Sequence, residues 1–250
     1  MDGTLRAPGG RPSLGRLIGA LRRADGFLLL SGLLLADGAL VGVHTLHKLS
    51  PLFADAAFGL DTEWGFAELF QYAKFAALVL MLGAVWARTR ETIYGTWMLL
   101  FAYMLGDDAL QVHERIGALI AGDWQFRPAV GLRPQDFGEL AVSAVFGLAL
   151  VSLIALMYGR SGRLARTDTR TLVRLIAALG FFGVGMDMAH EIVDGSIRYL
   201  GGFVGIIEDG GEMVVASVLC WYVATLVAHR RAAEDGDVGV PRGSALHPAH

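Results

Sequence analysis

Six apolar segments separated by short polar stretches set the pattern of the chain. Each is long enough to cross a hydrocarbon core of about 30 Å, which takes roughly 20 helical residues. The runs are continuous, whereas the strands of a membrane β-barrel alternate between apolar and polar residues. The pattern therefore predicts an all-α integral membrane protein, a six-transmembrane helical bundle. We expect its helices near residues 26–47, 65–87, 93–121, 135–158, 171–199 and 203–228.

Composition agrees with a membrane protein. Hydrophobic residues make up 54% of the chain and the mean hydropathy is +0.50, outside the ordinary range of soluble domains. The single cysteine, Cys220, excludes an internal disulfide and a thiolate metal cluster. We predict one transmembrane domain over residues 25–229, between a flexible basic segment, 1–24, and a flexible tail, 230–250.

Lys and Arg are distributed unequally between the two sides of such a bundle. Arginines precede the first helix, follow the second and the sixth, and crowd the stretch GRSGRLARTDTR, residues 159–170. We expect this stretch to be the loop between the fourth and fifth helices. Because basic loops stay on the cytoplasmic side, both termini should be cytoplasmic and the protein should lie in the cell (inner) membrane.

Acidic residues from different helices gather at one depth. With a rise of about 1.5 Å per residue, Asp187 on the fifth helix and Asp107 on the third both lie roughly 21 Å from the cytoplasmic face. Glu68, Glu139 and Glu212, on the returning helices, come to a similar level. The sequence predicts a polar layer in the outer third of the membrane, facing the extracytoplasmic side. The cytoplasmic halves of the helices are nearly uncharged.

The faces of the helices indicate whether these groups can meet. In GMDMAHEIVDG, residues 185–195, four polar side chains fall within an arc of roughly 100°, so one face carries all of them. They are Asp187, His190, Glu191 and Asp194. On the third helix His113 points roughly 100° away from Glu114 unless the helix is locally distorted.

The six predicted helices form three hairpins that carry similar residues at equivalent positions. The returning helices align on Glu68, Glu139 and Glu212, and the outgoing helices end on His44, His113 and His190. Three copies running in the same direction predict parallel hairpin repeats about an axis along the membrane normal. Residues 48–64, which join the first pair of helices, are expected to form a short amphipathic lid over the polar layer.

The acids of this layer outnumber the internal cations, which are Lys74, Arg115 and Arg198. Burying many charges in hydrocarbon is costly, so either several acids are protonated or a divalent metal lies among them. Carboxylate beside imidazole suits zinc, iron or manganese. The predicted metal ligands are His190, Glu139, Glu212, Glu114, Asp107, His113, Glu68 and His44.

The first functional hypothesis is a membrane-embedded metalloenzyme, a hydrolase or oxidoreductase, with Glu191 and Asp187 as its catalytic residues. Its partners would be the lipid bilayer and a lipid-like or small extracytoplasmic substrate, with no nucleic acid. The alternative is a cation- or proton-coupled transporter, which needs a polar route to both faces. Haem binding by paired histidines would leave the acids unexplained. Common nucleotide-binding and catalytic motifs are absent from the sequence. The six residues HEIVDG, 190–195, resemble a metal-binding segment of zinc-transporting permeases, a match too short to transfer any residue's role.

Overall fold

The computed structural model describes residues 14–50, 53, 55–124, 133–186, 188–190 and 200–238. Within these ranges its side chains are described from residue 25 to residue 231. The described part is entirely helical, with seven α-helices and no strand, which confirms that the protein is all-α. In chain order the α-helices are α1 (Leu14–Leu49), α2 (Phe66–Thr89), α3 (Thr92–Leu110), α4 (Val112–Asp123), α5 (Pro134–Arg160), α6 (Arg163–Gly180) and α8 (Leu200–Val238). A 3-10 turn, η2 (Ala56–Phe58), precedes α2, and a π-helical turn, η3 (Phe181–Met186), continues α6.

Five long helical stretches are apolar enough to cross a membrane: Asp25–Leu49, Phe66–Thr89, Pro134–Arg160, Arg163–His190 and Gly201–Arg231. Helix α3 is not one of them, because threonine, tyrosine and aspartate lower its mean hydropathy. It is nevertheless packed inside the bundle, with Ile93, Tyr94 and Phe101 fully buried.

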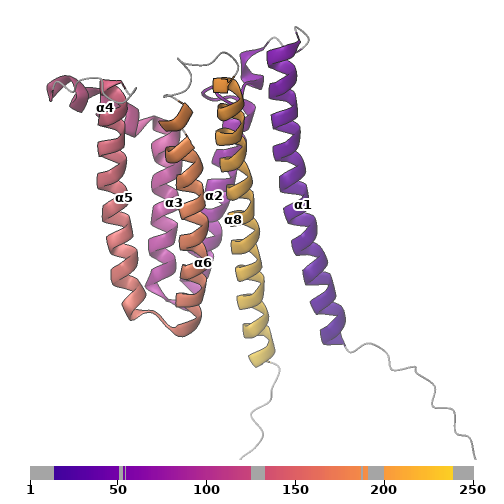
Figure 1. The fold of residues 1–250 in the computed structure, drawn as a ribbon. Helices are drawn as coiled ribbons and strands as arrows, with labels where there is room; N and C mark the ends of the chain where they lie inside the picture. The colour runs from indigo at the N-terminus through magenta and orange to yellow at the C-terminus, as the bar shows by residue number, and fades with distance from the viewer. Residues whose placement is uncertain are drawn as a thin grey trace, which may run out of the picture.

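The helices run alternately along the bundle, as Figure 1 shows. Helices α1, α3 and α6 run toward one end, and α2, α5 and α8 return from it. We name the end where α1 finishes and α2 begins the upper end, and the opposite end the lower end. Helix α8 contacts α1, α2 and α6, while α5 lies against α3 and α4. The described helices therefore form one packed assembly.

The centre of the bundle is a tight apolar core made by α2, α3, α6 and α8. Leu78, Trp97, Leu172 and Leu219 are among its members, and each is no more than 1% exposed. In a membrane, where lipid is as apolar as the core, such helices are held by close packing and interhelical hydrogen bonds. This core separates the polar groups of the upper end from those of the lower end.

The predicted helix 93–121 is wrong as a single element. The chain breaks between α3 and α4 at Gln111, which adopts a left-handed conformation with φ 51° and ψ 45°. The backbone N–H of His113 then donates to the side chain of Asp107 at 2.9 Å, so a carboxylate takes part in the turn. In a regular helix His113 would point away from Glu114, and this break is the local distortion that changes its orientation.

The loop expected at residues 159–170 is also wrong over most of its length. Helix α6 already begins at Arg163, eight residues before the predicted span. Arginines recur along it with helical spacing on one face, at positions 163, 166, 170 and 174, while Ala165, Thr169 and Leu172 are buried. The final part of the predicted span, 191–199, lies outside the described residues. Helix also extends into both terminal segments that were expected to be flexible, from Leu14 in α1 and to Val238 in α8.

Glycines allow the closest helix contact, between α4 and α5. A Cβ atom on Gly138 would overlap the backbone carbonyl of Gly117, and one on Gly117 would overlap the backbone of Glu139. Elsewhere Gly183 of η3 makes room for the Glu212 carboxylate on α8. Small residues allow this kind of close approach between membrane helices.

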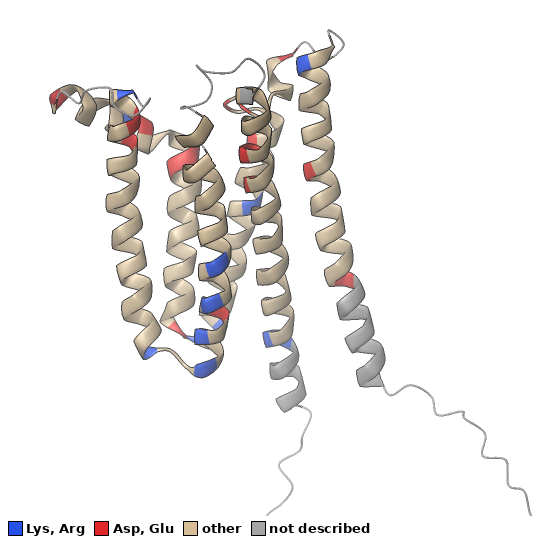
Figure 2. Cartoon of the chain, viewed as in Figure 1, with Lys and Arg blue, Asp and Glu red and all other residues tan. Residues whose placement is uncertain are grey.

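Charges are segregated along the bundle axis. Figure 2 shows most acidic residues toward the upper end and most Lys and Arg residues toward the lower end. Among the described residues, most acids therefore lie toward one end of the bundle, whereas Asp168 and Glu91 lie toward the other. The assignment of the lower end to the cytoplasm remains a prediction.

Candidate functional site

A pocket of about 260 Å³ opens at the upper end of the bundle. Six of its lining residues are acidic, and they come from α2, α3, α8 and the segment before α2. These six are Asp61, Glu63, Glu68, Asp108, Asp209 and Glu212. The remaining lining residues are Leu60, Thr62, Ala67, Gln71, Tyr72 and Met213. We call this the acidic pocket.

The segment before α2 forms one wall of the acidic pocket and is fixed by two contacts. The backbone N–H of Leu60 donates to His44 Nδ1 at 2.9 Å, and His44 is 5% exposed at the end of α1. Lys48 lies 3.1 Å from Asp61 Oδ2. Although burial opposes it, the Lys48 ammonium holds the pKa of Asp61 below its usual value. His44 therefore has a structural partner here rather than a place among converging acids.

Gln71 is the most unusual residue of the acidic pocket. It is one of the residues that line the pocket and is only 7% exposed, yet neither its buried amide nitrogen nor its buried amide oxygen has a hydrogen-bond partner. Most buried amides are paired, because an unsatisfied buried polar group costs about 1–3 kcal/mol. An unpartnered amide at the wall of a pocket indicates a place where a ligand or water supplies the missing hydrogen bonds.

A buried ion pair lies next to the acidic pocket, at the junction of α1, α2 and α8. Lys74 Nζ lies 2.6 Å from Asp37 Oδ1, and each side chain is 2% exposed. The other carboxylate oxygen of Asp37 accepts from Ser217 Oγ at 2.6 Å. Lys74 also donates to the carbonyl oxygen of Met213 at 2.9 Å and lies over the Phe70 ring, 4.4 Å from its centroid.

Two residues connect this ion pair to the acidic pocket. Met213 lines the pocket with its side chain while its carbonyl accepts from Lys74. Gln71 stands one helical turn before Lys74 on α2. A charge that enters the pocket therefore comes close to a lysine and an aspartate that are shielded from solvent.

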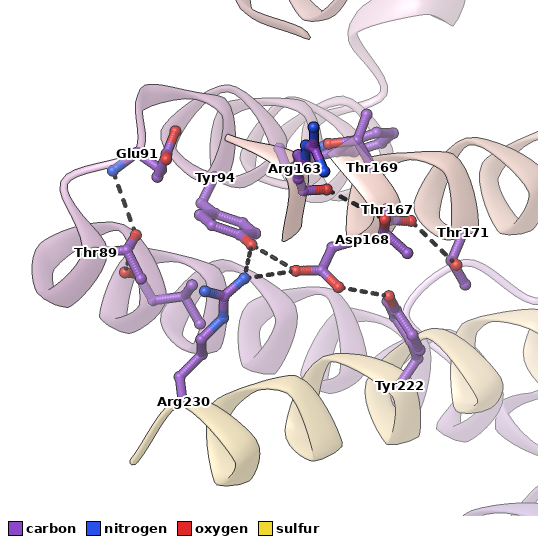
Figure 3. A network of polar contacts seen from close by, with 12 residues as sticks. Thr89, Glu91, Tyr94, Arg163, Thr167, Asp168, Thr169, Thr171, Tyr222 and Arg230 are labelled. Carbon is purple, nitrogen blue, oxygen red and sulfur yellow. Dashed lines mark hydrogen bonds and ion pairs between the residues drawn. The ribbon is translucent and has the colours of Figure 1, made fainter. Parts of the chain in front are cut away.

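A second polar cluster occupies the lower end (Figure 3). Asp168 of α6 accepts hydrogen bonds from Tyr94 of α3 at 2.6 Å and from Tyr222 of α8 at 3.2 Å. Arg230 lies 2.9 Å from the same carboxylate and donates to the Tyr94 hydroxyl at 2.8 Å. The cluster ties three helices together, and we call it the lower cluster.

The eight predicted metal ligands fall in separate places. Glu68 and Glu212 line the acidic pocket, and His44 supports its wall. His190 contacts Glu208 of α8, with 3.0 Å between Nδ1 and Oε2. The other four are Asp107, His113, Glu114 and Glu139, near the break between α3 and α4 and the start of α5.

The members of this last group have different partners. His113 Nδ1 lies 3.1 Å from Asp107 Oδ2, whereas Glu139 accepts from Gln135 of its own helix at 2.7 Å. Partial burial, together with the nearby Glu139 carboxylate, raises the pKa of Glu114 above its usual value.

Among the described residues, no group of three or more His, Cys, Asp and Glu side chains is arranged to hold a metal ion. The two predicted catalytic residues, Asp187 and Glu191, lie outside the described residues. Asp136 has a structural role, because it accepts from the backbone N–H of Arg133 at 2.7 Å and forms a capping box at the start of α5.

Sequence reasoning missed Gln71 and the lower cluster. Asp168 was hidden in a stretch interpreted as a loop, although the helical spacing of the arginines around it was a usable signal. Tyr94 and Tyr222 were counted as part of nearly uncharged helix halves. No local pattern marks Gln71, because its burial depends on how α2 packs against its neighbours.

The acidic pocket, the buried ion pair and Asp168 all lie within residues 27–229, which match a family described as Domain of unknown function (DUF8692). The chain belongs to this family. Arg230 of the lower cluster falls one residue beyond the matched region. No curated protein and no solved structure matches the chain.

Proposed function

We propose that this member of the DUF8692 family is a proton-coupled cation carrier, with the acidic pocket as its outer cation site. The observation that carries the proposal is the buried Lys74–Asp37 pair beside that pocket. Ionisable residues inside membrane helices are costly, and where they occur they mark ion pathways and proton relays. A buried ion pair is also weak as a source of stability, because desolvation offsets the attraction between its charges.

The pair and the pocket have a simple electrostatic relation. A cation bound in the acidic pocket adds positive charge close to the Lys74 ammonium. Repulsion between the two makes cation binding and loss of a proton from the ion pair favour each other. Exchange of one cation for a proton follows from this coupling.

A carrier also needs polar groups toward the opposite face. The lower cluster supplies them, which removes the main objection that the sequence raises against transport. Tyr222 stands five residues beyond Ser217 on α8, roughly 7.5 Å along the helix. Leu78 and Leu219 are fully buried in the apolar core, which stands as the barrier that must open during transport.

The proposed membrane arrangement follows the alternating helices and the charge segregation. We place α3 as a sixth span because it is packed within the bundle, and the arginine-rich lower end in the cytoplasm by the positive-inside rule. This puts the acidic pocket on the extracytoplasmic side of the cell membrane. The three-hairpin repeat stays a prediction: His113 and His190 each contact a carboxylate, whereas His44 accepts from a backbone N–H.

A metalloenzyme is the second candidate, favoured by one observation. Glu68 and Glu212, two of the predicted ligands for zinc, iron or manganese, line the same pocket as Asp108. In this case Glu191 and Asp187 would supply the acid–base chemistry on a lipid-like substrate. One apolar groove between α1 and α8 would suit a lipid chain, but it includes Asp25 and His229 at the lower end, far from the acids.

Flux through reconstituted protein separates the two candidates. Liposomes that contain the full chain and an internal pH-sensitive dye are given external Mn²⁺ or the diamine putrescine, each with a matched potassium control. A carrier that exchanges cations for protons alkalinises the interior in step with cation uptake, beyond any change in empty liposomes. Absence of both cation uptake and proton movement, in protein that is shown to be folded, would contradict the carrier and leave the enzyme.

A further inference from the structure

We propose that the acidic pocket takes a small organic cation that carries a primary amine, rather than a bare metal ion. The transport of this amine rests on the proposed function, whereas its binding is inferred from the size, the charge and the hydrogen-bonding groups of the pocket itself.

Size is the first argument. The volume of about 260 Å³ equals roughly nine water molecules at about 30 Å³ each. A bare divalent ion needs several ligand atoms converging at about 2.0–2.6 Å. The described residues contain no group arranged in this way. The cavity therefore has room for a molecule of several heavy atoms.

Charge is the second argument. Six of the twelve lining residues are acidic, and the other ionisable one is Tyr72. None of the twelve is Lys, Arg or His. Lys48 pairs with Asp61 at the rim, and Lys74 is turned to Asp37. The field in the pocket therefore favours a positively charged occupant and disfavours a carboxylate or phosphate.

The apolar part of the wall is the third argument. Leu60, Ala67 and Met213 are all buried and belong to one apolar cluster. Tyr72 adds an aromatic ring, which lies edge-on to Trp64 with 5.9 Å between centroids. A hydrated metal ion gains nothing from such a wall, whereas the carbon chain of an amine removes apolar surface from water there.

Gln71 is the fourth argument, and it points to an amine. An alkylammonium has three N–H donors, and the Gln71 amide oxygen is a buried acceptor without a partner. Glu68 and Glu212 line the same pocket, and their carboxylates add negative charge that attracts an ammonium group. The amide of Gln71 would thus place the ammonium at the deep side of the pocket, near the carbonyl region of Met213.

Calorimetric titration of the detergent-purified full chain tests this inference. The probes are putrescine, butane-1,4-diol as the uncharged molecule of the same length, and Mn²⁺. We expect putrescine to bind, the diol not to bind, and Mn²⁺ to bind at least tenfold more weakly than putrescine. Tighter Mn²⁺ binding that displaces putrescine would overturn the inference in favour of a metal, and binding of neither cation would overturn it altogether.

Variants locate the site. Gln71→Leu keeps the size of the side chain and removes the amide, and we expect at least tenfold weaker putrescine binding because a hydrogen bond to a charged group is lost. Glu212→Gln removes one charge with little change of shape and should weaken binding to a similar extent. The matched control is Asp123→Asn, an exposed acid on α4 outside the pocket, which should change affinity less than twofold. Equal losses in the variants and the control would show a diffuse negative field and overturn the site.

The binding and flux experiments test two separate claims. Amine binding without any transport would contradict the carrier and leave the ligand class intact. Mn²⁺ transport without amine binding would contradict the ligand class and leave the carrier intact.

Discussion

Removal of one member of the Lys74–Asp37 pair should destabilise the protein far more than removal of both. Lys74→Met leaves the Asp37 carboxylate buried with the Ser217 hydroxyl but without its counter-charge. Asp37→Asn leaves the ammonium buried with neutral acceptors and the Phe70 ring, again without a counter-charge. Because both side chains are 2% exposed, water cannot replace the lost partner. Breaking a buried pair in this way costs about 3–5 kcal/mol.

The double variant, Asp37→Asn with Lys74→Met, removes both charges together. Replacement of a whole buried pair is often nearly neutral, so we expect the double variant within about 1 kcal/mol of the wild type. Thermal unfolding in detergent measures the difference. At about 2–4 °C per kcal/mol for a chain of this size, each single variant should lower the melting temperature by about 6–20 °C.

A surface pair provides the control. Lys48 and Asp61 also form an ion pair at 3.1 Å, but their side chains are 51% and 60% exposed. Lys48→Met should therefore change stability by no more than about 1 kcal/mol. Single and double effects that simply add at Lys74 and Asp37 would refute the reasoning, since independent sites add and coupled ones do not.

Three further predictions concern the upper end. Gly138→Ala should destabilise by about 1–3 kcal/mol through overlap at the α4–α5 contact, whereas Gly147→Ala, with nothing within 4 Å of its Cβ position, should be neutral or stabilising; equal effects on the melting temperature would contradict the contact. Gln111→Gly should stabilise the protein by about 1 kcal/mol, because glycine adopts the left-handed conformation of residue 111 without strain. If α3 and α4 were one unbroken helix, the same change would destabilise it by about that amount. A rise in melting temperature therefore supports the break, and a fall contradicts it. The pKa of Glu114 is raised in the folded state, so ionisation of Glu114 opposes folding as the pH rises above the usual pKa. Glu114→Gln should therefore stabilise the protein at pH 7.5 and lose this advantage below about pH 4.5. A difference in melting temperature that is the same at the two pH values would contradict this prediction.

Hydropathy was sufficient to predict the long helices, because a run of apolar residues must be helical to satisfy its backbone in a membrane. The depth of acids along each helix was also predictable, since the rise per residue is constant. This is why Glu68, Asp108 and Glu212 were expected at one level and do line one pocket.

The pairing of side chains depends on helix rotation and neighbour choice, which one sequence does not encode locally. Asp37 stands seven residues before His44 on the first helix, yet its partner is Lys74 on another helix. The break at Gln111 has no glycine or proline to mark it, and it relies on Asp107 accepting a backbone N–H six residues later. Asp168 was overlooked because a dense run of arginines resembles a loop, although an amphipathic helix has the same composition.

Proton movement coupled to cation uptake, compared between the wild type and the Asp37→Asn, Lys74→Met double variant in liposomes, tests the central claim most directly. The internal dye reports protons, and labelled putrescine or Mn²⁺ reports the cation. The proposed carrier predicts that the wild type exchanges the two and that the folded double variant has lost proton movement. Proton movement of equal size in both proteins, or in neither, would contradict the assignment of the buried pair as the coupling element.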